Sequence, residues 1–193
     1  MLSSTSSTAS ATATVLQDKA EITELLNLYG FALDAHRWEL FDRIFTDDVL
    51  AEFGPAGSVW TGLPTLIHEF KTFHDQLDNH AHMMFGQLVE VDGDVAHAFS
   101  YGTWLLVRFA AGDDPNWTGT GWYDDVLVRT ERGWRISHRV CRLVSWTGNP
   151  LVSEPEYKHN PDMRFNVLST QAAEGKIRFL AALSKEEAGH ADR

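Results

Sequence analysis

Cysteine and basic residues are scarce in this sequence. Cys141 is the only cysteine among 193 residues, so a disulfide within the chain and a thiolate metal cluster are excluded. The 16 Lys and Arg side chains face 27 Asp and Glu side chains, which gives a net charge of −11. Because phosphate binding needs a basic face, this balance argues against nucleic acid as a partner. A neutral or cationic small-molecule ligand is the remaining interpretation.

Long apolar runs are also missing. No stretch approaches the roughly 20 apolar residues that a membrane span requires. The opening segment, MLSSTSSTASATAT, has neither the basic start nor the apolar run of a signal peptide. We therefore expect a flexible tail over residues 1–14, no membrane partner and a cytoplasmic protein.

Apolar and aromatic residues, by contrast, are plentiful. They make up 44% of the chain and include seven Trp and eleven Phe, enough to fill one sizeable core. We expect a single domain over residues 15–146. Residues 147–193 would form a C-terminal extension, with a helix over residues 164–184 that packs on the domain or on a neighbouring subunit.

Helical patterns precede the extended ones. Apolar spacing predicts helices over residues 15–35 and 38–45, and a third helix that begins near Pro64 and ends near Leu77. The runs that predict strands cover residues 49–53, 58–61, 81–91, 95–110, 118–130 and 134–146. Helices followed by an antiparallel meander indicate an α+β fold, in which a strongly bent sheet wraps over the helices and leaves a pocket on its concave side.

Two polar residues could meet in that pocket. Asp34 ends the first helix and His82 opens a long strand, with His80 on the same strand face. A buried histidine needs a hydrogen-bond partner, and Asp34 could hold one ring nitrogen while the other takes a proton as a general base. Asp34 could also simply end the helix, and Tyr29 could be a core residue.

Three segments in order carry a family resemblance: YGFALDAHRWELFDRIF at 29–45, HAHMMFGQLVEVDGDVA at 80–96 and WYDDVLVRTERGWRISHRV at 122–140. They resemble the SnoaL-like branch of the nuclear transport factor 2-like superfamily, which includes scytalone dehydratase, hexachlorocyclohexane dehydrochlorinase and bile-acid dehydratase. The resemblance covers roughly residues 15–146. It implies a cone-shaped α+β barrel, with three N-terminal helices packed in a strongly curved antiparallel or mixed sheet. It also implies no cofactor and a homo-oligomer, dimer or trimer, formed through the outer face of the sheet. The high aromatic content suggests a hydrophobic substrate.

The resemblance also assigns roles to residues. Asp34 in LDAHRW matches the family's catalytic aspartate, and His82 in HMMFG matches its catalytic histidine. Tyr29 matches a tyrosine with a hydroxyl-binding or acid role. Arg142 is the nearest candidate for an arginine that enters the pocket from the last strand, although a bulge there would reverse its face. Scytalone dehydratase has a pocket tyrosine where this chain has Leu33, and it has a second histidine in the next strand, where residues 101–105 have none.

Other residues are expected at the wall of the pocket or outside it. Tyr123, Trp60, Trp104 and Trp122 are expected wall residues and Phe53 a substrate contact. His80 is expected to be a rim or packing residue that also contacts substrate. The remaining histidines show neither zinc-cluster nor HExxH spacing, so we expect no metal site; they include His68, His74, His97, His138 and His159.

Together these patterns predict an enzyme. We expect a metal-free lyase or isomerase that abstracts a proton from a polyketide, terpenoid, steroid-like or aromatic molecule, with dehydration or a related elimination as the leading reaction. A cyclase or isomerase of natural-product biosynthesis is one alternative. A non-catalytic binding module, such as the small subunit of a ring-hydroxylating dioxygenase, is another. Contact between Asp34 and His82 within about 3–4 Å inside a pocket would favour the enzyme.

Overall fold

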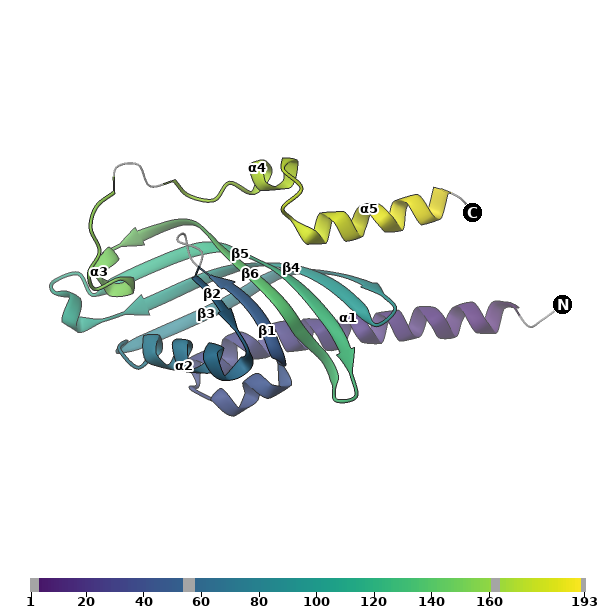
Figure 1. The fold of residues 1–193 in the computed structure, drawn as a ribbon, viewed down its shortest axis with the longest axis horizontal. Coiled ribbons are helices and arrows are strands. Elements are labelled where there is room, and N and C mark those ends of the chain that lie inside the picture. The colour runs from purple at the N-terminus through teal and green to yellow at the C-terminus, as the bar shows by residue number, and fades with distance from the viewer. Residues whose placement is uncertain (1–3, 54–57, 161–163, 192–193) are drawn as a thin grey trace.

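The computed structural model describes residues 4–53, 58–160 and 164–191 (Figure 1). Three helices come early: α1 (Ser4–Asp34), the 3-10 helix η1 (Trp38–Arg43) and α2 (Leu63–His74). The strands are β1 (Phe45–Phe53), β2 (Ser58–Thr61), β3 (Asn79–Asp92), β4 (Val95–Val107), β5 (Asn116–Thr130) and β6 (Gly133–Gly148). A short 3-10 helix, η2 (Phe109–Ala111), follows β4, and α3 (Pro150–Ser153), α4 (Leu168–Ala173) and α5 (Arg178–Ala191) follow β6.

The six strands form one curved sheet in the order β2-β1-β6-β5-β4-β3. Strands β1 and β6 pair in parallel, whereas the other neighbours pair antiparallel, so the sheet is mixed. It does not close, since β2 and β3 form its two edges. The predicted α+β fold with a strongly curved sheet is thus confirmed. Helices α1 and α2 lie on one side of the sheet, and α4 and α5 lie on the other (Figure 1).

Bulges in β6 determine which residues face the helices. In the pairing with β5, Leu127 lies opposite Ile136 and Val126 opposite His138, so Ser137 is an extra residue. A second extra residue, Val144, follows. Each extra residue reverses the alternation of side chains along the strand and increases its bend. Between the two bulges, the odd-numbered residues of β6 face the concave side.

Helix α1 begins earlier than predicted. It includes residues 4–14, for which we expected a flexible tail, and its N-terminal part extends beyond the sheet (Figure 1). This segment consists of Ser, Thr and Ala, of which only Ala has a high helix propensity, and it continues a helix that is anchored by the buried residues Ile22, Leu26 and Leu33. In the described part of the chain, no helix is both long and apolar enough to span a membrane.

The C-terminal extension also differs from the single helix predicted over residues 164–184. Helix α4 ends near Gly175, whose φ of +69° turns the chain, and α5 begins at Arg178. At this turn Ile177 and Phe179 pack against Phe99 and Trp122 on the outer face of the sheet. The extension therefore covers part of that face.

Candidate active site

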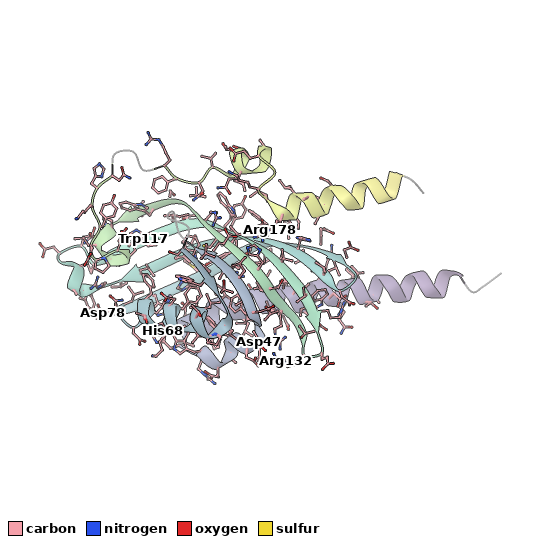
Figure 2. All side chains as sticks on the ribbon, viewed as in Figure 1. Asp47, His68, Asp78, Trp117, Arg132 and Arg178 are labelled. Atoms are coloured by element: carbon pink, nitrogen blue, oxygen red, sulfur yellow. The ribbon has the colours of Figure 1, made fainter. Side chains whose placement is uncertain are left out.

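A cavity of about 510 Å³ opens on the concave side of the sheet. Trp117, which lines the cavity, lies toward the α3 end of the sheet (Figure 2). Half of the residues that line the cavity are aromatic: Tyr29, Phe53, Trp60, Phe70, Phe73, Trp104, Trp117, Tyr123, Trp146 and Tyr157. Pro150, Ser153 and Glu154 also line it, so the start of the C-terminal extension completes the wall.

Asp34 holds His82 at this cavity. Its Oδ1 lies 2.8 Å from Nδ1 of His82, and its Oδ2 accepts the backbone N–H of His82 at 2.8 Å. The His82 side chain is only 8% exposed, and it lines the cavity. The carboxylate thus binds both the ring and the backbone of His82. This contact lies within the 3–4 Å limit that distinguished an enzyme from a binding module.

His80 and His36 extend the contact toward the surface. Nδ1 of His80 lies 3.1 Å from the same Oδ1 of Asp34, and its Nε2 lies 2.8 Å from Nε2 of His36. The side chain of His80 is nearly buried, whereas that of His36 is 40% exposed. A continuous row of polar contacts therefore leads from His82 to solvent. His80 does not line the cavity, although we expected a substrate contact there.

The charge on Asp34 determines the tautomers of these rings. Burial alone would raise the pKa of Asp34, but hydrogen bonds from His80 and His82 outweigh it and hold the pKa well below its ordinary value. An ionised carboxylate can only accept hydrogen bonds, so His80 and His82 both carry a proton on Nδ1. In neutral His82, Nε2 is then the basic nitrogen. Within the described residues, no hydrogen bond is made to it.

His74 is a third histidine of this group, and the sequence did not single it out. It ends α2, and its Nδ1 lies 2.7 Å from the backbone carbonyl oxygen of Phe70. Its ring centroid lies 4.8 Å from that of His80 and 5.2 Å from that of His82. Burial, with a contribution from nearby His82, lowers the pKa of His74 to about 3, so the ring is neutral near pH 7.

Two tyrosines of the cavity wall lie against an arginine that is fully buried behind them. The guanidinium of Arg139 lies 4.1 Å from the ring centroid of Tyr29 and 4.5 Å from that of Tyr123, and it forms a two-point ion pair with Asp125. The indole N–H of Trp104 donates to the Tyr123 hydroxyl at 2.6 Å. Burial raises the pKa of both phenols, so they stay protonated and can donate hydrogen bonds.

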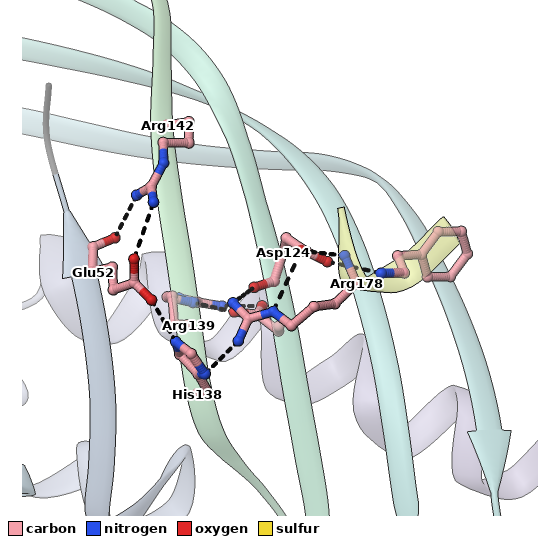
Figure 3. A network of polar contacts seen from close by, with 8 residues as sticks. Glu52, Asp124, His138, Arg139, Arg142 and Arg178 are labelled. Carbon is pink, nitrogen blue, oxygen red and sulfur yellow. Dashed lines mark hydrogen bonds and ion pairs between the residues drawn. The ribbon is translucent and has the colours of Figure 1, made fainter. Parts of the chain in front are cut away.

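Arg142 does not reach the cavity. It lies between the two bulges at an even-numbered position, and its Nη2 pairs with Glu52 at 3.0 Å on the outer face of the sheet (Figure 3). Its neighbours Cys141 and Leu143 line the cavity instead. The extra residue Ser137 reverses the face that Arg142 would otherwise share with Ile136, which is buried in the core.

The other residues predicted at the pocket also divide between the cavity and the outer face of the sheet. Phe53, Trp60, Trp104, Tyr123 and Tyr29 line the cavity. Trp122 does not, because it faces the opposite side of β5 and packs against Phe99 and Phe179. Alternation along β5 thus separates Trp122 from its neighbour Tyr123.

Comparison with known families identifies the family of this chain. The SnoaL-like domain family matches residues 14–140 of this chain. The chain belongs to the SnoaL-like family.

Three similar proteins place this SnoaL-like chain among known sequences and folds. "Uncharacterized protein Rv2910c" of Mycobacterium tuberculosis is 33% identical over 130 residues, which cover 65% of this chain and 84% of that protein. A candidate scytalone dehydratase from Novosphingobium aromaticivorans has a TM-score of 0.65 at 19% identity, over 80% of this chain and 99% of that one. A hexachlorocyclohexane dehydrochlorinase (LinA), Type2, has a TM-score of 0.62 at 15% identity, over 77% of this chain and 97% of that one.

One signal in the SnoaL-like sequence could have identified His74. It follows Phe70 by four positions, so the two side chains share the inner face of α2. Spacing along the chain did not indicate a site, because His74 lies on a helix while His80 and His82 lie on the strand that follows. Their proximity depends on how α2 packs against β3.

Proposed function

We propose that this SnoaL-like protein is a lyase that removes a proton from the carbon next to a carbonyl group and expels a β-leaving group, most simply water. The observation that carries the proposal is the position of His82. Asp34 holds its Nδ1 at 2.8 Å, and its ring lines a largely aromatic cavity. This arrangement leaves Nε2 as the base.

The reaction needs three groups of this chain. Nε2 of His82 takes the α-proton, and the carboxylate of Asp34 stabilises the imidazolium that forms. A phenol hydroxyl, from Tyr29 or Tyr123, donates a hydrogen bond to the enolate oxygen. As the carbon–carbon double bond forms and the carbon–oxygen bond breaks, His82 returns its proton to the departing hydroxyl. Water leaves, and His82 is neutral again.

The charge of the wall narrows the substrate class. Among the described residues that line the cavity, Glu69 and Glu154 are the carboxylates, and none is Lys or Arg. Anionic substrates would meet repulsion without a cationic partner. The volume of about 510 Å³ lies within the roughly 300–1,000 Å³ typical of small-molecule sites. We infer an uncharged or cationic hydrophobic substrate of the polyketide, terpenoid, steroid-like or aromatic kind.

The names of two similar structures also describe elimination reactions, but the proposal does not rest on them. A dehydratase removes water and a dehydrochlorinase removes hydrogen chloride, and both are eliminations. These two structures are less than 25% identical to this chain, so they support the fold alone. The reaction rests on Asp34, His82 and the cavity.

The experiment uses β-hydroxy-α-tetralone, a bicyclic ketone whose loss of water gives fluorescent α-naphthol. We expect wild-type protein to form α-naphthol, and His82→Gln to lose about 10²- to 10⁴-fold in rate. His68→Gln is the matched control, because His68 is an exposed histidine of α2 outside the cavity wall. Equal rates for wild type and His82→Gln would overturn the assignment of the base.

A second measurement separates the lyase from the binding module and from an isomerase. In heavy water, the base should exchange the α-protons of α-tetralone and of larger cyclic ketones, which NMR follows without any leaving group. Binding of these ketones with no exchange above the buffer rate would exclude proton abstraction and favour the binding module. Exchange without elimination from the β-hydroxy ketones would favour the isomerase.

Self-association remains part of the proposal. We infer that copies associate through the outer face of the sheet, outside the patch at Phe99 and Trp122 that the C-terminal extension covers. Light scattering on the full chain tests this, and a monomer at all concentrations would exclude it.

A further inference from the structure

Three histidines converge beside the cavity. One possible ligand atom from each of His74, His80 and His82 lies within 4.8 Å of those of the other two. Zn²⁺ binds histidine nitrogen at about 2.0–2.1 Å, so ligands in a tetrahedral site lie about 3.3 Å apart. The three side chains would therefore have to turn to bring one nitrogen each to a single ion.

Each ring is already oriented by an acceptor on Nδ1. His74 donates to the carbonyl oxygen of Phe70, and His80 and His82 donate to Oδ1 of Asp34, at 2.7, 3.1 and 2.8 Å. Carbonyl and carboxylate oxygens only accept hydrogen bonds, so all three Nε2 atoms present lone pairs. Metal-binding histidines almost always have such a carbonyl or carboxylate behind the ring, which fixes the tautomer and raises the basicity of the ligand.

His74 supplies an independent observation. The residue is only 3% exposed, and its buried Nε2 has no hydrogen-bond partner in the described part of the chain. A buried polar atom without a partner costs about 1–3 kcal/mol. A cation bound to this nitrogen would give it a partner.

From these observations we propose that His74, His80 and His82 form a site for a divalent transition metal ion such as Zn²⁺. Imidazole ligands suit Zn²⁺, Cu²⁺, Ni²⁺ and Co²⁺, whereas Mg²⁺ and Ca²⁺ prefer oxygen. The carboxylate of Asp34 lies behind two of the rings and contributes a negative charge. His74 and His82 both line the cavity, so an open coordination position can face it.

The site implies a form of regulation, which rests on the proposed function. The metal takes the lone pair of His82 Nε2 that removes the substrate proton, so a bound ion inhibits the elimination. It also competes with His36, whose Nε2 contacts that of His80 at 2.8 Å. His36 is partly exposed and can move aside, and a hydrogen bond of this kind contributes only about 1 kcal/mol.

Direct binding tests the site without reference to activity. Full-length protein, first freed of metal with EDTA and then dialysed, is titrated with Zn²⁺ in a calorimeter and with Co²⁺ in a visible spectrometer. We expect one ion per chain, with the intense visible bands of Co²⁺ in a tetrahedral site. His74→Gln and His80→Gln should each bind at least tenfold more weakly, and His68→Gln should bind like wild type. Asp34→Asn should weaken binding by about 10- to 100-fold.

Two results would overturn the site: no binding by wild-type protein, or equal affinity in wild type, His74→Gln and His80→Gln. Circular dichroism checks that each variant is folded. If either His74→Gln or His80→Gln does not fold, the other variant still tests the site.

Activity is a separate readout. Zn²⁺ should inhibit α-naphthol formation, and EDTA should restore it. If the wild-type protein binds metal but His82→Gln is as active as wild type, the metal site stands and His82 is not the base. If His82→Gln loses activity but the wild-type protein binds no metal, His82 remains the base and the metal site is excluded.

Discussion

Gly30 of α1 lies directly against the backbone carbonyl of His82. A Cβ atom at position 30 would come within 2.6 Å of that oxygen, a distance that real Cβ contacts essentially never show. The absence of a side chain at Gly30 therefore lets α1 approach β3 closely enough for Asp34, one helical turn later, to reach His82. Helix packing thus determines the geometry of the candidate base.

We expect Gly30→Ala to reduce both stability and catalysis. Alanine favours a helix over glycine by up to about 1 kcal/mol, but overpacking against backbone costs about 1–3 kcal/mol, so the net change is destabilising. Displacing His82 from Asp34 should also lower kcat. Phe31→Ala is the control, since Phe31 is the next residue and is 61% exposed. Urea unfolding and the α-naphthol assay measure the two effects, and a more stable, fully active Gly30→Ala would contradict this account.

Asp34→Asn should lower kcat by about 10²- to 10⁴-fold while the chain stays folded. The amide oxygen can still accept the backbone N–H of His82, but the negative charge that stabilises the imidazolium is lost. Asp48→Asn, at an exposed position of β1, controls for the change in net charge. Steady-state rates with circular dichroism test this, and an unchanged kcat would remove Asp34 from the mechanism.

His74 should make the folded chain less stable in mild acid. An unfolded histidine titrates near pH 6.5, whereas burial and nearby His82 lower the pKa of His74 to about 3. Between these values the unfolded chain binds a proton that the folded chain does not. The contribution of His74 to the free energy of unfolding is therefore full above pH 6.5 and falls by about 1.4 kcal/mol per pH unit as pH decreases toward 3.

Urea unfolding with EDTA present measures this dependence without bound metal. Many carboxylates titrate in the same range, so the informative quantity is the difference between wild type and His74→Gln. The variant should show a shallower slope by about one proton. Parallel slopes would mean that His74 is protonated in the folded chain at mildly acidic pH.

Cys141 should react slowly with iodoacetamide in the folded protein. Burial raises the pKa of its thiol to about 12, even though Arg139 and Arg142 act in the opposite direction. The reactive thiolate is then rare at mildly basic pH. Mass spectrometry should show rapid alkylation only after unfolding in guanidinium. Cys141 also lines the cavity, so a bound ketone should slow the reaction further. Alkylation of the native protein at the rate of an exposed thiol would contradict its burial.

Phe179→Ala should release the C-terminal segment from the outer face. Phe179 is 5% exposed against Phe99 and Trp122, and truncating such a buried ring costs about 3–5 kcal/mol. Asp124 accepts the backbone N–H groups of Arg178 and Phe179, and its polar contacts alone should not hold the segment (Figure 3). Trypsin should therefore cut after Arg178 faster than in the control Leu180→Ala, whose side chain is 41% exposed. Equal cleavage rates would show that the apolar contact does not anchor the segment.

Local patterns in the sequence were sufficient for most of the fold. The predicted strand over residues 58–61 matches β2, and the predicted strands over residues 81–91 and 95–110 correspond to β3 and β4. The spacing of apolar residues also located the long first helix and α2, because this spacing indicates which face of a single helix or strand is buried. The pairing of Asp34 with His82 came from the family resemblance together with the chemistry that a buried histidine requires.

The tertiary structure alone decided three things. The extra residue at Ser137 turned Arg142 to the outer face, which alternation read from the sequence could not reveal. Packing of α2 against β3 brought His74 to His80 and His82. The turn near Gly175 placed Ile177 and Phe179 on the outer face of the sheet. Periodicity is set by neighbours within a few residues, whereas bulges and helix packing depend on contacts between segments far apart in the chain. The sequence by itself therefore determined most of the elements and the Asp34–His82 pair, and the long-range contacts decided which other residues join that pair.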